Sequence, residues 1–467
     1  MNNFSVTIDA EGVALITFDV PGKGMNVISF DVQREFAEVV EMLRSNPAIR
    51  GAVWVSGKTS GFCAGADLPE IAGRFDDWRE ATSQVQLRNA LAESASWSRH
   101  LRALETCGKP VAVAIAGLAL GGGLELVLAC HYRVAVDDPT LRLAFPEVGV
   151  GLLPGAGGTQ RLTRLLGISA VLPHLLEGTP IAPADALASG VLHAVLPADQ
   201  LIDAARRWVL EHPEAQAPWD LPDFQLPGGG VHSAPGYRYF APALAARVGS
   251  SGGRYPAVAN ILKCVYEGAQ LPIEAGLRVE SRYFFNTVRS PVAKAMARSQ
   301  FTARQALAKR ESREDLSDYL SQLRHAVATE QQAMVEEGIP PALIANLSRR
   351  NAIRAEVERP AAVAQPCADE VDFAAVAELE LRLLYTQALT AVRCLENQVV
   401  RDPLEADSGA LAAGFPVWSG GPVSYIEVQG LEAFVAQAER LASRFPQRFH
   451  VPRSLHERAA DRRGFHS

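Results

Sequence analysis

Short apolar runs alternate with helical patterns through the first third of the chain, and this alternation constrains the fold more than any other feature. The runs SVTID, VALITFDV, GAVWVSG and PVAVAIAG have the length and composition of strands. Between the second and third runs, SFDVQREFAEVVEMLRS repeats apolar residues at near-helical spacing, which predicts an amphipathic helix. Alternating strands and helices predict an α/β layered domain.

The composition changes after about residue 215, and a chain of 467 residues is long enough for several domains. Proline and glycine are frequent in residues 216–255, which predicts a connector after an α/β domain at 1–215. Residues 256–357 are mostly helical in pattern. A stretch of low hydrophobicity at 358–370 predicts a linker, and VDFAAVAELELRLLYTQALTAVRCLENQVV then opens an all-α region at 371–467.

Charge and cysteine usage exclude several classes of protein. The formal net charge is −7, so an interaction with nucleic acid is not expected. The six cysteines are scattered without a C-x-x-C pair, which argues against a disulfide framework and a metal site. MNNFSVTIDAEG lacks the pattern of a secretory signal, and no uncharged apolar run reaches the roughly 18 residues of a membrane span. We therefore expect a cytoplasmic protein without a membrane span.

A triple glycine opens an apolar helix in AGLALGGGLELVLACHYRV, residues 116–134. Amide N–H groups at a helix N-terminus suit a developing negative charge. Glu125 is the only charged side chain between Leu118 and Cys130, and burial would raise its pKa toward the range of a general acid or base. The alternative interpretation is a helical glutamate that the helix dipole stabilises and that has no catalytic role.

Two further glycine-rich segments lie on either side of this one. GFCAGADLPEI, residues 61–71, follows an apolar strand, and its small residues allow a ligand to approach the backbone; the alternative is an ordinary turn. In LAFPEVGVGLLPGAGGTQRLTRLLG, residues 143–167, Glu147 is the only charge through Gly158. Its alternative is a loop glutamate paired with Arg161 or Arg164. GAGG lacks the Lys-Ser/Thr of a Walker motif, so nucleotide hydrolysis is not expected.

Considered together, the three segments predict one catalytic site. Two isolated carboxylates, 22 positions apart, each lie beside a glycine-rich element. Paired carboxylates divide acid and base roles when their environments separate their pKa values. Two loops can each contribute one amide donor to a carbonyl oxygen that gains negative charge.

FCAGADL, GLALGGGLELVLAC, FPEVGVGLLPGAGGTQRLTRLLG and EGTPIAPADALASGVLHAVLP, in this order, resemble the enoyl-CoA hydratase/isomerase family, also called crotonases. The resemblance covers the first 215 residues and implies a spiral of repeated strand-strand-helix turns. It implies catalytic carboxylates at Glu125 and Glu147 and an oxyanion hole formed by the Ala66 and Gly122 amides. The substrate, an acyl-CoA thioester, is then expected against Ala64, Ala66, Asp67, Leu68, Gly121 and Gly122.

The remainder resembles the large subunit of the fatty-acid oxidation multienzyme. AGLRVESRYFFNTVRSPVAKAMARSQF is similar to its connecting helix, and EEGIPPALIANLSRR and the segment from LRLLYTQALTAVRCLENQVV onward are similar to helical repeats of its 3-hydroxyacyl-CoA dehydrogenase. A G-x-G-x-x-G turn between a strand and a helix is not found in the sequence; GSSGGR at 249–254 lacks that context. We therefore expect no NAD, no other cofactor and no dehydrogenase activity.

The resemblance implies an enoyl-CoA hydratase, in which Glu125 activates the water and Glu147 supplies a proton to C2. Two alternatives stay open. One is another reaction on the same platform, such as double-bond isomerisation, thioester hydrolysis or C–C cleavage, since one fold hosts many reactions. The other is a non-catalytic acyl-CoA-binding or assembly subunit. The resemblance is also compatible with a homo-oligomer and with association with a thiolase or a dehydrogenase.

Overall fold

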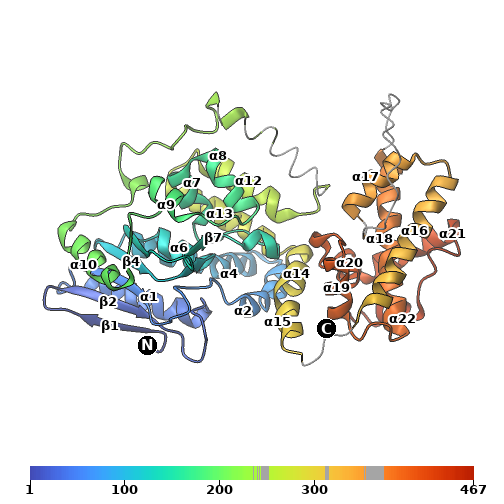
Figure 1. Cartoon of the computed structure of the whole chain (residues 1–467), viewed down its shortest axis with the longest axis horizontal. Helices are drawn as coiled ribbons and strands as arrows, with labels where there is room; N and C mark the ends of the chain where they lie inside the picture. Colours follow the sequence, from blue (N-terminus) through green and yellow to red (C-terminus); the bar gives the residue numbers. More distant parts are fainter. Residues whose placement is uncertain are drawn as a thin grey trace. The chain divides into compact units, whose positions relative to one another are not determined.

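The chain consists of two compact units, Met1–Ser290 and Pro291–Ser467 (Figure 1). The computed structural model describes residues 1–234, 236–238, 240, 242, 252–310, 315–351, 353 and 373–466. The whole linker predicted at 358–370, and residues 249–251 of the GSSGGR segment, lie outside the described residues. Each unit is described by itself below.

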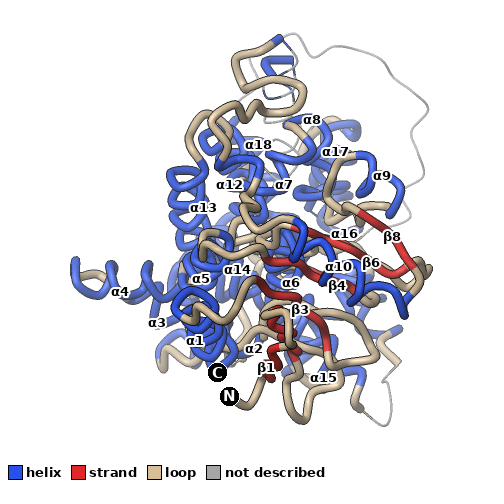
Figure 2. The backbone as a smooth tube through the Cα atoms, turned by 90° about the vertical axis from the view of Figure 1, so that its left-hand side faces the viewer, coloured by secondary structure: helices blue, strands red, loops and turns tan. Residues whose placement is uncertain are grey.

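A six-stranded sheet in the order β1-β2-β3-β4-β6-β8 forms the centre of the first unit (Figure 2). β1 and β2 pair as an antiparallel hairpin through Gly12, whose φ is +82°, and the other neighbours in the sheet are parallel. A second sheet pairs β5 with β7. The strands are β1 Phe4–Ile8, β2 Val13–Phe18, β3 Gly51–Ser56, β4 Val111–Ile115, β5 Leu118–Leu120, β6 Tyr132–Val136, β7 Arg142–Ala144 and β8 Ala194–Leu196.

Both faces of the large sheet are covered, which explains why its strands read as continuous apolar runs. α10 packs on one face, where it contacts Val53 and other alternate strand residues. The other face carries Trp54 and the main core of the unit, which includes apolar residues of α1, α5 and α6. The first helices are α1 Phe30–Ser45, α2 Leu68–Ala72, α3 Phe75–Glu80, α4 Gln84–Ser94, α5 Ser96–Glu105 and α6 Gly122–Leu128.

The later helices of the first unit include two beyond the predicted connector. They are η1 Glu147–Val150, α7 Gly158–Leu166, α8 Ile168–Leu176, α9 Pro183–Ala188, η2 Ala198–Gln200, α10 Leu201–Glu211, η3 Pro218–Asp220, α12 Pro256–Gly268 and α13 Ile273–Val288. The sequence-based boundaries group α12 and α13 with the helical region 256–357, whereas the structure divides the chain after Ser290.

Side chains of α7 explain why α12 and α13 pack on the first unit. The Gln160 amide donates to the Cys264 carbonyl at 3.0 Å, and a Cβ on Gly268 or Gly276 would meet the Gln160 side chain within 2.5 Å. The Arg164 guanidinium donates to two carbonyls at the end of α12, those of Gly268 and Leu271. These buried polar groups need α12 and α13 as partners, because an unsatisfied buried donor is costly.

The secondary-structure elements described in the second unit are helices. A buried charge network links α16 and α18: Arg382 donates to Glu330 at 2.6 Å and to Glu337 at 2.7 Å, and Arg448 contacts both carboxylates. The helices are α14 Pro291–Ala297, the π-helical turn η4 Arg298–Thr302, α15 Ala303–Ala308, α16 Ser317–Glu336, α17 Pro341–Asn351, α18 Phe373–Glu396, α19 Pro403–Ala412, η5 Val417–Ser419, α20 Pro422–Gln429, α21 Leu431–Arg444 and α22 Arg453–Ala460.

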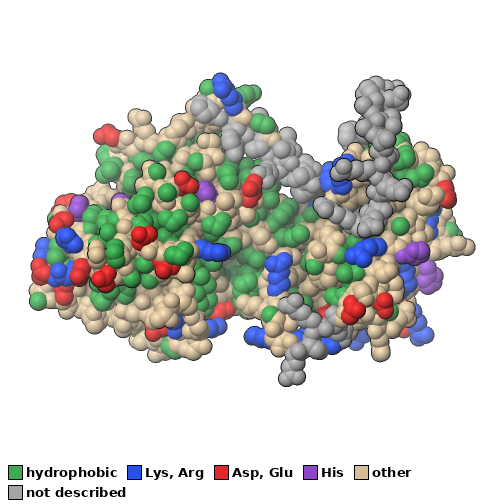
Figure 3. Space-filling model, viewed as in Figure 1, with side chains coloured by type: hydrophobic (Ala, Val, Ile, Leu, Met, Phe, Trp, Pro, Cys, Tyr) green, Lys and Arg blue, Asp and Glu red, His purple; other side chains and the backbone are tan. Residues whose placement is uncertain are grey.

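Two surface properties bear on the predicted class of protein. On the face in Figure 3, Lys and Arg side chains are interspersed with Asp and Glu and do not form one basic patch. Among the helices that the structure describes, none combines the length and the apolar composition needed to cross a membrane.

Candidate active site

Three loops meet beside the small sheet and create the candidate site. The backbone of Ile28 bridges to Ala66, and Cys63 bridges to Ala119 in β5. The Gly121 N–H donates to the Ala144 carbonyl at 2.9 Å, which joins the loop after β5 to the end of β7. The predicted glycine-rich segments at 61–71, 116–134 and 143–167 are therefore neighbours in space.

The Ala66 and Gly122 amides lie close together on two of these loops. The Ile28 N–H donates to the Gly65 carbonyl, and the Ile28 carbonyl accepts the Asp67 N–H. This pairing directs the Ala66 N–H away from Ile28. A Cβ on Gly122 would lie 3.7 Å from the Ala66 nitrogen. In the described part of the chain, neither amide donates to a protein acceptor, and both residues line one cavity. Two such donors suit an oxygen that gains negative charge.

Glu125 lies on the first turns of α6 and is 3% exposed. Its Oε1 accepts hydrogen bonds from the Ala156 N–H at 2.7 Å and the Gly158 N–H at 2.8 Å. Burial raises the pKa of Glu125 to about 7, against the opposing effect of these two amides and of Arg161. A carboxylic acid with a pKa near 7 can donate or accept a proton at neutral pH.

Glu147 begins η1 and faces the glycine triplet. A Cβ on Gly121 would lie 2.7 Å from the Glu147 Oε1, so only a glycine leaves room for this carboxylate. Its Oε2 is buried without a hydrogen-bond partner among the described residues. Burial raises the pKa of Glu147 well above its ordinary value, and the nearby Glu125 and Glu280 charges raise it further. The surroundings of Glu147 therefore favour its protonated form more than water does.

The structure excludes the pairings that the sequence left open for Glu147. Arg161 is fully buried and its guanidinium donates to Glu105 at 2.9 and 3.1 Å. Arg164 donates to the Gln160, Gly268 and Leu271 carbonyls. Glu147 is thus not the partner of either arginine in the described contacts.

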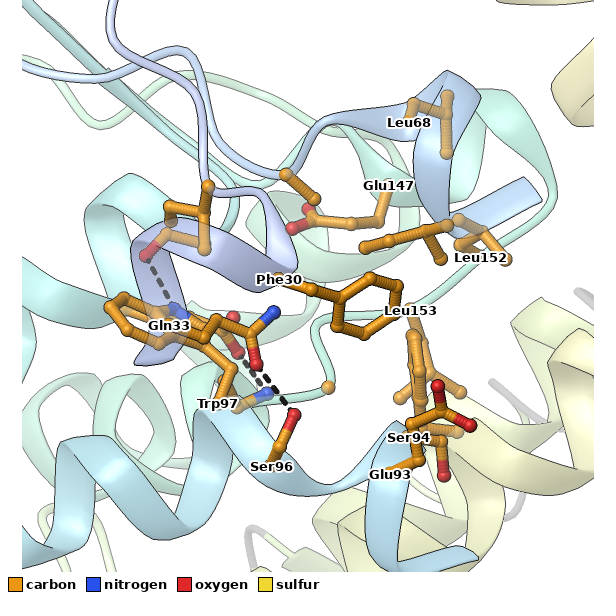
Figure 4. A pocket seen from close by; sticks show the side chains of 18 of the residues that line it. Phe30, Gln33, Leu68, Glu93, Ser94, Ser96, Trp97, Glu147, Leu152 and Leu153 are labelled. Atoms are coloured by element: carbon orange, nitrogen blue, oxygen red, sulfur yellow. Dashed lines mark hydrogen bonds between the residues drawn. The ribbon is translucent and has the colours of Figure 1, made fainter. Parts of the chain in front are cut away.

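A largely apolar cavity adjoins both carboxylates and both amides (Figure 4). It contains about 670 Å³ not occupied by atoms, part of which is open to solvent. Figure 4 shows Glu147 and Leu68 on one side, Ser96 and Trp97 on the other, and Phe30 between them in this view. The lining consists of Ile28, Phe30, Gln33, Ala66, Leu68, Ile71, Trp78, Glu93, Ser94, Ser96, Trp97, Gly122, Glu125, Glu147, Leu152, Leu153, Gly155, Ala156 and Phe284.

Polar groups in the wall fix the positions of the surrounding helices. The Trp97 Nε1–H of α5 donates to the Gly122 carbonyl at 3.3 Å, which ties α5 to the glycine triplet. The Ser96 hydroxyl donates to the Gln33 Oε1 of α1 at 2.5 Å. An apolar cavity with a few convergent polar groups is typical of a ligand-binding site.

The structure places the predicted site residues unequally. Ala66, Leu68, Gly122, Glu125 and Glu147 line the cavity. Ala64, Asp67 and Gly121 lie outside its lining in the described part of the chain. The Ala64 N–H donates to the Asn26 carbonyl, whereas Asp67 caps α2 and forms an ion pair with Lys23 at 3.2 Å. The described residues contain no cluster of three His, Cys, Asp or Glu suited to hold a metal.

Sequence reasoning missed two residues of α13 that reach the site from more than 100 positions away. Phe284 lines the cavity, and its ring would collide with a Cβ on Gly155 at 2.5 Å. Glu280 is completely buried and contacts the loop that holds Glu125. A signal was present: Ile273, Leu277, Glu280 and Phe284 recur at helical spacing, so Glu280 occupies a position on the apolar face.

Comparison with known proteins identifies the N-terminal part. The model of the enoyl-CoA hydratase/isomerase family matches residues 9–217. The fatty acid oxidation complex subunit alpha of Shewanella sp. (strain MR-4) is 36% identical over 304 residues, which are 64% of this chain and 41% of that protein. The subunit of the same name from Shewanella putrefaciens is 38% identical over 304 residues, with the same coverage. The match thus spans less than half the length of these relatives.

Two solved structures of proteins named enoyl-CoA hydratase are similar to this chain. That from Bacillus anthracis is 24% identical, with a TM-score of 0.38, and the similarity covers 66% of this chain and 96% of that one. That from Mycobacterium avium subsp. paratuberculosis is 18% identical, with a TM-score of 0.43, and covers 67% and 99%.

The predicted fold classes are confirmed: a crotonase-like α/β fold in the N-terminal part and a helical C-terminal region. The resemblance of the C-terminal helices to dehydrogenase repeats stays a prediction. The family match includes the loops that carry Ala66, Gly122, Glu125 and Glu147. Residues 9–217 therefore match the enoyl-CoA hydratase/isomerase family, as the sequence resemblance predicts.

Proposed function

We propose that this chain hydrates a trans-2-enoyl-CoA thioester to the 3-hydroxyacyl-CoA. The observation that supports the proposal best is the meeting of two buried carboxylates and two unpaired backbone amides at one apolar cavity. The cavity would hold the acyl chain, and the amides of Ala66 and Gly122 would hold the thioester oxygen. The substrate class is part of the proposal.

The addition of water needs one base and one acid on the two carbons of the double bond. Ionised Glu125 accepts a proton from water as the water oxygen bonds to C3, and the π electrons move toward the thioester oxygen. The Ala66 and Gly122 amides stabilise the resulting enolate. The enolate then takes the proton of Glu147 at C2. Proton exchange with solvent returns Glu125 to the ionised form and Glu147 to the acid, so the net change is one added water.

The environments of the two carboxylates favour this division of roles. Glu125 keeps two amide donors on Oε1, which stabilise its ionised form, and the pKa of Glu125 is raised only to about 7. The Glu147 Oε2 has no donor in the described structure, and the pKa of Glu147 is raised further by the Glu125 charge. Carboxylates whose pKa values are set apart can serve as base and acid at the same pH.

Isomerisation is the second candidate, and Glu147 is the observation that favours it. A single carboxyl group can move a proton between C2 and C4, and Glu147 has an unpartnered oxygen near the oxyanion amides. The two reactions give different products from a trans-2-enoyl-CoA. Hydration creates a hydroxyl group at C3, whereas isomerisation moves the double bond and adds no mass.

A panel of trans-2-enoyl-CoA substrates of increasing chain length tests the proposal. We expect loss of the conjugated enoyl absorbance and, in heavy water, a 3-hydroxy product with one deuterium at C2. Glu125→Gln and Glu147→Gln should each lower kcat by at least about 10²-fold, the low end for a general acid or base. Glu41→Gln, the same change on an exposed turn of α1, is the matched control. Normal rates in both site variants would contradict the assignment.

Three further predictions from the sequence belong to this proposal. The chain should not bind NAD, so 3-hydroxyacyl-CoA and NAD together should give no NADH absorbance; a robust NADH signal would refute this. The matched relatives are named as subunits of a fatty acid oxidation complex, which supports an association of this chain with a thiolase or a dehydrogenase. The cytoplasmic location stays a prediction.

A further inference from the structure

A third buried carboxylate lies behind the candidate site, on a helix outside the family match. Glu280 of α13 is 0% exposed. Its Oε1 accepts the Gly157 N–H at 2.5 Å, and its Oε2 accepts both the N–H and the hydroxyl of Thr159, at 2.9 and 2.5 Å. Three donors on one carboxyl group fix its position relative to the loop, because any displacement would leave buried polar groups without partners.

The loop that Glu280 anchors is the same loop that holds Glu125. The Ala156 and Gly158 amides donate to Glu125, and the intervening Gly157 and the following Thr159 donate to Glu280. Successive amides thus alternate between two carboxylates, one from α6 and one from α13. A displacement of the loop would move both hydrogen bonds that orient Glu125.

We propose that Glu280 is a positioning residue, which fixes loop 156–159 and thereby the orientation of the Glu125 carboxylate. The inference rests on the proposed function, in which Glu125 is the general base. Glu280 itself is absent from the cavity lining, whereas Phe284, one helical turn further along α13, forms part of it. α13 therefore completes the site with one residue behind the catalytic loop and one in front.

Several titratable groups surround Glu280 and interact electrostatically with its carboxyl group. Glu125 and Glu147 interact with it as like charges, and both α7 arginines, Arg161 and Arg164, interact with it as opposite charges. Among the described residues, the Cys264 thiol of α12 also interacts with the Glu280 charge. Removing the Glu280 charge should ease the ionisation of Glu147, since like charges raise the pKa of a carboxyl group.

A purely structural role makes a different prediction. Glu280 also caps the N-terminus of α7, so its loss could lower stability without changing the chemistry of the folded enzyme. In that case kcat per folded molecule stays constant and only the amount of folded protein falls. A positioning role lowers kcat in the folded protein while KM changes little, because the acyl cavity is retained.

The experiment compares Glu280→Gln with Glu274→Gln, the same change on the first turn of α13, where Glu274 forms a half-exposed ion pair with Arg102. Glu280→Gln should lower kcat about ten-fold or more, since small misplacements of a catalytic group carry such costs. KM should stay within about two-fold, and Glu274→Gln should match wild type within the same margin. Thermal unfolding and circular dichroism establish the folded fraction. On the alkaline side of the kcat profile, where Glu147 loses its proton, the fall in kcat should move to lower pH in Glu280→Gln.

A double variant decides whether Glu280 acts through Glu125. In a Glu125→Gln background, adding Glu280→Gln should change the residual kcat by less than about two-fold, whereas independent effects would multiply. Full additivity, or an unchanged kcat in Glu280→Gln, would overturn the proposal.

Hydrogen exchange separates this inference from the proposed function. The amides of 156–159 should exchange faster in Glu280→Leu than in Glu274→Gln, with no substrate present. If wild type fails to hydrate any enoyl-CoA, the proposed function fails, yet the exchange measurement still tests the anchor. Equal protection in the two variants would show that Glu280 does not hold the loop.

Discussion

The pKa of the proposed base, Glu125, determines how the reaction rate depends on pH. The pKa of Glu125 is raised by burial to about 7, so below this pH a growing fraction of the base is protonated and inactive. We expect kcat/KM to fall below about pH 7 with the slope of one proton, as for a single essential base. Assays after brief incubation at low pH and return to neutrality control for unfolding. A flat profile from acid to neutral pH would exclude Glu125 as the base.

The buried Glu280 gives a second pH prediction, which concerns the stability of the fold and not the reaction rate. Burial raises the pKa of Glu280 from 4.5 to about 8, so the folded state binds its proton more tightly than the unfolded state does. Stability from this group is therefore greatest below the unfolded pKa and is lost as pH rises through the folded pKa. The melting temperature of wild type, relative to Glu280→Gln, should decline between about pH 5 and pH 8. A constant difference would contradict the raised pKa.

At the scale of elements, the start of α6 controls where Glu147 lies. Gly121 has a φ of +51°, and a Cβ there would lie 2.7 Å from the Glu147 Oε1. Gly121→Ala should therefore strain the turn and displace the carboxyl group, with a fall in kcat of about ten-fold or more, since a general acid contributes at least that much. Gly149→Ala, in the same η1 turn as Glu147, adds a methyl group in open space and is the control. Equal rates in the two variants would contradict this role of Gly121.

The sequence predicts several elements of the first unit because their local signals agree with the tertiary structure. Apolar runs at 51–57 and 110–117 become β3 and β4, and the glycine triplet starts α6. Lone charges in apolar segments also identify Glu125 and Glu147. Glu280 and Phe284 could not be assigned in this way, because helical spacing shows that a residue is buried but not which loop it contacts. That information depends on how α13 packs on α7.

The same argument explains the difference in domain boundaries. Proline and glycine after residue 215 predict a connector, yet they do not show where a compact unit ends. α12 and α13 have helical composition like the second unit, but Gln160 and Arg164 of α7 bind their backbone. Polar contacts between segments 100 positions apart have no signature in a composition profile, so the boundary at Ser290 appears only in the structure.

At the scale of the whole molecule, the division after Ser290 predicts how truncations behave. A protein ending at Ser290 keeps α13, including Glu280 and Phe284. It should fold and retain kcat within about two-fold of the full chain, since every residue that lines the cavity belongs to the first unit. A protein ending at Tyr255 loses the partners of Gln160 and Arg164 and exposes buried residues of α7 and α8, so it should be insoluble or inactive. Turnover per folded molecule and melting temperature compare the two. An active, stable protein that ends at Tyr255 would show that the site is complete without α12 and α13. An inactive, unfolded protein that ends at Ser290 would show that the first unit requires the second unit to fold.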